Sequence, residues 1–167
     1  MGSPSHGGSG LKTVRLILSA VGRAKPGPEK DLFGHYARRL TWPLHLREVE
    51  EKKAGLPVPE RIRREGRLLL DTVPDGAAVI VLDEQGKNLT SEVFAARLGE
   101  WRDQGRPACA FLIGGADGHA EEVIARADLL LSLGALTWPH MLARIMMLEQ
   151  VYRARQILVG HPYHREG

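Results

Sequence analysis

The sequence has one cysteine, few aromatic residues and no long apolar run, and each shortage excludes a class of protein. The single cysteine, Cys109, cannot form an internal disulfide, and no Cys/His cluster has the spacing of a zinc site. No apolar stretch approaches the about 20 residues that a membrane helix needs. No apolar secretory core follows the N-terminus. We therefore expect a metal-free cytoplasmic protein without a membrane segment.

The charge is also nearly balanced, with 23 Lys and Arg against 20 Asp and Glu and a formal net charge of +3. This balance permits a nucleic-acid partner without requiring one, because phosphate binding depends on where charges cluster. The 167 residues suit one globular domain. Residues 1–10 are rich in Gly and Ser, so we interpret them as a flexible N-terminal extension or tag. Residues 11–167 then form the single domain.

Short apolar runs alternate with amphipathic segments along the rest of the chain. We expect strands over residues 13–21, 44–49, 77–82, 108–113 and 129–133. We expect helices over residues 29–40, 59–72, from Thr90 or Ser91 past Trp101, 119–126 and 139–156. The alternation predicts an α/β fold with a mostly parallel sheet flanked by helices. Ligands bind beyond the carboxyl ends of such strands, so the loops after Leu82, Ile113 and Leu133 are the candidate site.

Two of these loops have a composition that suits a ligand. Residues 114–118 (GGADG) let the backbone approach a ligand closely, but they match neither the dinucleotide nor the P-loop pattern. A tight strand-to-helix turn is the simpler interpretation of this segment. Residues 133–139 can present backbone N–H and C=O groups to an adenine edge between apolar side chains. An ordinary loop packed under a helix explains them equally well.

The last expected helix has apolar residues at 4-3-4 spacing from Met141 to Tyr152, which suits packing on the sheet and on a partner protomer. Arg144, Arg153 and Arg155 are candidates for a phosphate-binding edge, although a solvated face is the simpler alternative. The tail at residues 161–165 (HPYHR) supplies an imidazole, a phenol and a guanidinium. A disordered terminus is the alternative for this tail.

The order of these blocks resembles the RlmH family, the pseudouridine N3-methyltransferases of large-subunit ribosomal RNA, which belong to the knotted SPOUT methyltransferases. The resemblance spans about Val14 to Glu166. It is carried by AVG, VLDEQGKNLTSEVFA, FLIGGADGH, LGALTWPHMLARIMMLEQVYRA and HPYHRE. Two departures could loosen donor binding: Ala116-Asp117 replaces the family's Pro-Glu, and Gly134 replaces its Ser.

The resemblance implies a C-terminal deep trefoil knot, a homodimer, and S-adenosyl-L-methionine as methyl donor with no metal. By motif match, the donor-binding residues would be Leu82, Gly114, Leu133, Gly134, Ala135, Leu136, Thr137 and Trp138. The catalytic candidates of a composite active site would be Tyr163, His164, Arg165, His140 and Arg153.

The implied reaction is methylation of N3 of a pseudouridine in helix 69 of 23S ribosomal RNA on the assembled 70S ribosome. The imide proton must be lost, and we assign His164 or Tyr163 to that proton. Arg165 would lie near a phosphate or near the negative charge that develops on the ring. Two alternatives stay open: a non-catalytic ribosome-binding protein on the same fold, and a related knotted methyltransferase acting on transfer RNA.

Overall fold

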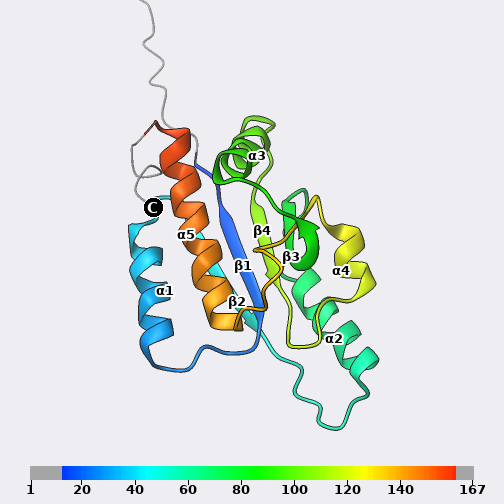
Figure 1. The fold of residues 1–167 in the computed structure, drawn as a ribbon. Coiled ribbons are helices and arrows are strands. Elements are labelled where there is room, and N and C mark those ends of the chain that lie inside the picture. The colour runs from blue at the N-terminus through cyan, green and yellow to red at the C-terminus, as the bar shows by residue number, and fades with distance from the viewer. Residues whose placement is uncertain (1–12, 161–167) are drawn as a thin grey trace, which may run out of the picture.

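A five-stranded parallel sheet organises the protein, whose computed structural model describes residues 13–160 (Figure 1). The strands are β1 Leu16–Val21, β2 Leu44–Val49, β3 Ala78–Lys87, β4 Cys109–Ile113 and β5 Leu129–Leu131. The helices are α1 Pro28–Arg39, α2 Val58–Leu70, α3 Ser91–Asp103, α4 Glu121–Arg126 and α5 His140–Leu158. The strand order β2-β1-β4-β3-β5 confirms the predicted parallel α/β sheet.

Helices cover both faces of the sheet, and the period of two along each strand separates two apolar cores. On β1, Leu16 and Leu18 pack with Phe33 of α1 and with residues of α3 and α5. Ile17, between them, packs with Leu69 of α2 and with α4 on the opposite face. Because both faces are buried, these strands are continuous apolar runs in the sequence.

The third strand is longer than the sequence predicted. We expected it to end at Leu82 and to turn over residues 83–87, which is wrong, because β3 runs on to Lys87. Both Leu82 and Lys87 pair with Leu131, so the residues between them bulge out of the ladder. A Cβ on Gly86 would lie 2.7 Å from backbone atoms of residues 130 and 131. Glycine therefore allows two chain segments that are distant in the sequence to lie in direct contact.

The helix boundaries largely follow the local signals. The hydroxyl of Thr90 caps α3 by accepting a hydrogen bond from the Val93 N–H at 3.1 Å, as its sequence predicted. Residue 139 precedes α5, which continues to Leu158. Three elements are shorter than expected by two residues or more: β1 begins at Leu16, β5 ends at Leu131 and α4 begins at Glu121. Within residues 13–160, no helix has both the length and the apolar character to cross a membrane.

Arg144 departs from the prediction of an exposed or phosphate-binding position. Only 3% of its side chain is exposed, and its Nη1 donates to Glu48 Oε2 at 2.7 Å. Its Nη2 donates to the carbonyl of Gly22 at 2.8 Å. The start of α5 packs over the carboxyl ends of β1 and β2, so this arginine points inward and fastens the helix to the sheet.

Candidate functional site

A pocket of about 240 Å³, the smaller pocket, lies at the carboxyl ends of β3, β4 and β5. All of the predicted donor-binding residues except Ala135 line it: Leu82, Gly114, Leu133, Gly134, Leu136, Thr137 and Trp138. Ala135 is exposed on the same loop. Three segments that lie far apart in the sequence therefore converge, because parallel strands bring their carboxyl ends to one edge.

The loop after β5 forms one side of the smaller pocket and exposes apolar side chains. Leu136 is 73% exposed and Trp138 is 40% exposed. The loop is nevertheless held in place: Ser132 Oγ accepts from the Gly134 N–H and donates to its carbonyl, both at 3.1 Å. Trp138 Nε1 donates to the carbonyl of Leu133 at 3.3 Å. A fixed loop with exposed apolar side chains beside backbone polar groups suits a flat, partly apolar ligand.

The glycine segment after β4 forms the opposite side, and its tight turn is confirmed. Gly118, at φ +85°, donates its N–H to the carbonyl of Gly115 at 3.1 Å. A Cβ on Gly115 would lie 2.9 Å from Glu65 Oε2 of α2 and 3.3 Å from a methyl group of Val21, so a larger residue here would have to displace the Glu65 carboxylate. Burial raises the pKa of the Glu65 carboxyl against the opposing charge of Arg61. The tight turn after β4 therefore also forms one wall of the smaller pocket.

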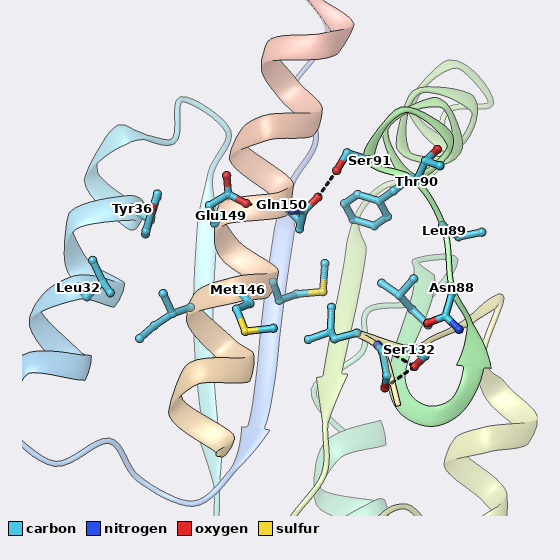
Figure 2. A pocket seen from close by; sticks show the side chains of 16 residues that line it. Leu32, Tyr36, Asn88, Leu89, Thr90, Ser91, Ser132, Met146, Glu149 and Gln150 are labelled. Carbon is cyan, nitrogen blue, oxygen red and sulfur yellow. Dashed lines mark hydrogen bonds between the residues drawn. The ribbon is translucent and has the colours of Figure 1, made fainter. Parts of the chain in front are cut away.

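A larger pocket, about 520 Å³, lies between α1, α5 and the segment that joins β3 to α3 (Figure 2). It shares Leu131, Leu133 and Gly134 with the smaller pocket, so the two pockets adjoin at the end of β5 and the loop that follows it. Leu32 and Met146 supply apolar wall (Figure 2). The polar wall is a chain of hydrogen bonds, in which Ser91 Oγ donates to Gln150 Oε1 at 2.8 Å and Gln150 Nε2 donates to Glu149 Oε2 at 3.0 Å.

The predicted catalytic residues occupy different places. His140, the first residue of α5, lines the smaller pocket. Arg153 lies 13 positions further along the helix, which is about 20 Å at the rise of an α-helix. Its Nη2 donates to Glu149 Oε1 at 2.7 Å, beside the larger pocket. Within one chain these two residues do not meet. Tyr163, His164 and Arg165 lie outside the described residues.

Neither the larger pocket nor a role for His119 was predicted from the sequence. The i,i+4 spacing of Glu149 and Arg153 was a readable signal for their ion pair. His119 directly follows the glycine segment, and it lines the smaller pocket. Cys109, in contrast, is fully buried, and burial raises the pKa of its thiol well above the ordinary range. That environment is typical of a core residue rather than a nucleophile.

A family model and curated relatives match this chain over most of its length. A family model described as "Predicted SPOUT methyltransferase" matches residues 14–164. A protein of Rhodospirillum centenum named ribosomal RNA large subunit methyltransferase H is 61% identical over 154 residues, covering 91% of this chain and 99% of the relative. A protein of the same name from Paramagnetospirillum magneticum is 57% identical over 152 residues, with the same coverage. A crystal structure of the SpoU methyltransferase AviRb from Streptomyces viridochromogenes matches with 13% identity and a TM-score of 0.47, over 88% of this chain and 61% of that one.

Proposed function

The chain belongs to the SPOUT methyltransferase family, and from this premise we propose that it transfers the methyl group of S-adenosylmethionine to large-subunit ribosomal RNA. Relatives that match nearly the whole chain at up to 61% identity carry the name of that activity. We further propose N3 of a pseudouridine in helix 69 as the acceptor atom, the 70S ribosome as the substrate particle and the cytoplasm as the compartment.

One observation carries the proposal of a donor site: residues after three different strands meet in the smaller pocket. Its residues fit S-adenosylmethionine, because Leu82, Leu133 and Leu136 can flank an adenine ring while the backbone at Gly114 is open to its polar edge. When bound, S-adenosylmethionine supplies an electrophilic methyl group on a sulfonium. The protein has to hold that group in line with the acceptor nitrogen, and positioning of this kind removes much of the entropic barrier.

The larger pocket is our candidate for the acceptor nucleotide, since it adjoins the smaller pocket at Gly134. Met146 and Leu32 offer apolar surface to a base, and the hydrogen-bonded chain from Ser91 to Glu149 offers polar groups. In this proposal His164 or Tyr163 takes the imide proton, and Arg165 stabilises the charge left on the ring.

A homodimer and a knot complete the proposal. Leu32 on α1 and Leu142 on α5 are 44% and 37% exposed, which leaves an apolar surface for a second copy of the chain. The distance between His140 and Arg153 also suits a composite site in which the tail of one chain serves the pocket of the other. The close contact of residues 130 and 131 with Gly86 is where we expect the trefoil knot to be threaded.

The test combines donor binding with mapping of the product. Titration calorimetry with S-adenosylmethionine should show saturable heat, which a non-catalytic ribosome-binding protein would not give. Leu136→Ala should weaken binding, because this exposed side chain lines the pocket, whereas Val93→Ala should not, since exposed Val93 lines neither pocket.

Ribosomes from a strain that lacks the modification then identify the acceptor. We expect methyl transfer to assembled 70S particles at the helix 69 pseudouridine, and little transfer to free 50S subunits or transfer RNA. Methylation of transfer RNA alone would favour the rival knotted methyltransferase. Wild-type rates in both His164→Ala and Tyr163→Phe, with donor saturating, would overturn the assignment of the base.

A further inference from the structure

The imidazole of His119 lies between the ends of β3 and β4. Its Nε2 is 2.9 Å from the carbonyl oxygen of Leu82. Its Cε1 and Nδ1 lie 3.0 and 3.2 Å from the point where a Cβ on Gly114 would be. All three residues line the smaller pocket, so this ring contacts the two strand ends that form the pocket floor.

The hydrogen bond to Leu82 fixes the protonation state of the ring. A carbonyl oxygen only accepts, so the Nε2 of His119 must carry the proton. Burial lowers the pKa of His119, although the hydrogen bond to Leu82 and the charge of Asp83 both oppose that shift. The imidazole is therefore neutral near pH 7, and its Nδ1 has a free lone pair that can accept a hydrogen bond.

No group within residues 13–160 uses that lone pair, since the described hydrogen bonds of His119 end at Leu82. Nor is Nδ1 sealed inside the protein. Among the side chains that the structure describes, Arg144 Nε is the polar atom that is both enclosed and unpartnered. His119 Nδ1 thus keeps some exposed surface, on a ring that lines the smaller pocket.

We propose that His119 is a donor-positioning residue of this enzyme: its Nε2–H holds the Leu82 carbonyl, and its Nδ1 accepts a hydrogen bond from S-adenosylmethionine. The ligand has hydroxyl and amino groups that can donate this bond. The inference rests on the proposed function, which identifies the occupant of the smaller pocket. It assigns two tasks to two nitrogens of one ring, and the tasks can be separated by substitution.

The variants His119→Gln and His119→Asn separate the tasks of the two ring nitrogens. The longer glutamine amide can still donate to Leu82 but places no acceptor at the Nδ1 position. The shorter asparagine places an oxygen near the Nδ1 position but does not reach Leu82. We expect each variant to raise the Kd for S-adenosylmethionine about three- to ten-fold, the range of one neutral hydrogen bond. The kcat at saturating donor should stay near the wild-type value. His45→Gln, on exposed β2, is the matched control and should change neither constant.

The pH profile of donor binding provides a readout that a purely structural role would not change. Protonated Nδ1 donates instead of accepting, and it brings positive charge near a cationic ligand. Because the pKa of His119 is lowered, affinity of the wild type should fall as the pH drops below about 6.5, the ordinary value for histidine. This fall should be steeper than that of His119→Gln. The other titratable groups around the pocket are common to both proteins and cancel in the comparison: Asp83, Glu84, Asp117, Glu65 and His140.

The outcomes distinguish this inference from the proposed function. Saturable heat in the wild type, with an unchanged Kd in His119→Gln and parallel pH profiles, would overturn the role of His119 alone. A wild type without saturable heat would overturn the proposed function together with this inference. Should His119→Asn fail to fold, His119→Gln still decides the matter, because it retains the bond to Leu82.

Discussion

Replacing Arg144 by methionine tests how the start of α5 is fixed to the sheet. Methionine fills much of the space of the arginine stem but removes the guanidinium. The variant loses the ion pair with Glu48 and the hydrogen bonds to the carbonyls of Val21 and Gly22. Because α5 begins directly after the loop that lines the smaller pocket, we expect lower stability and weaker donor binding together.

The expected loss of unfolding free energy depends on the contacts that Glu48 keeps after Arg144 is replaced. Breaking a buried ion pair from one side costs about 3–5 kcal/mol. The Glu48 side chain is 24% exposed, and it still accepts a hydrogen bond from the Ala24 N–H at 2.6 Å. Water and this backbone group therefore offset part of the cost of leaving the carboxylate without Arg144. We therefore expect Arg144→Met to lower the free energy of unfolding by about 3 kcal/mol, the lower end of that range. For a chain of this size that equals about 6–12 °C in Tm.

Urea denaturation of four proteins measures this effect: the wild type, Arg144→Met, Glu48→Gln and the double variant. The coupling energy should reach about 1–2 kcal/mol, as expected for groups in direct contact. Arg155→Met, on the same helix without an ion pair among the described residues, should change the unfolding free energy by less than about 0.5 kcal/mol. A loss below about 1 kcal/mol in Arg144→Met, or strictly additive effects, would refute the reasoning.

Three further predictions concern stability. Burial alone would raise the pKa of Glu48, but its hydrogen bonds from Arg144 and Ala24 and the charge of Arg144 outweigh burial and lower it. Its contribution is therefore complete above the unfolded-state pKa of about 4.3 and is lost as pH falls through the lower folded-state pKa. Acid titration should thus bring wild type and Glu48→Gln together below pH 4.3. Gly86→Ala should destabilise by about 1–3 kcal/mol through overpacking, whereas Gly34→Ala in α1 should gain up to about 1 kcal/mol in thermal unfolding. Thr90→Ala should cost about 1 kcal/mol by loss of the α3 cap, and Thr90→Ser should restore it.

The sheet and the convergence of the three post-strand loops were predictable because they follow from local patterns and one topological rule. Strands buried on both faces are apolar runs, so AAVIVL and the run ending at Ile113 were identifiable without any contact information. Alternation with helices made the sheet parallel, and a parallel sheet places its carboxyl ends at one edge. The smaller pocket lies at that edge, beside Leu82, Gly114 and Leu133.

The features that escaped prediction depend on partners far away in the chain. The extension of β3 past Leu82 is stabilised by pairing with Leu131, and residues 83–87 are by themselves good turn formers. Arg144 looks like a surface arginine until the ends of β1 and β2 are placed under it. The role of His119 depends on a carbonyl 37 positions earlier in the chain. Local propensity carries no information about such contacts.

The structure gives a local reason for the departure at Gly134. From the sequence, loss of the hydroxyl found in the family is a change that could loosen donor binding. The backbone at Gly134 has φ +110°, a region that strongly favours glycine, and the hydroxyl of Ser132 already bonds both its N–H and its carbonyl. A Cβ at Gly134 would meet no atom within 4 Å, so the two pockets adjoin beside open space. In the proposed arrangement, with the donor in the smaller pocket and the acceptor in the larger one, the absence of a side chain at Gly134 leaves the space between donor and acceptor open.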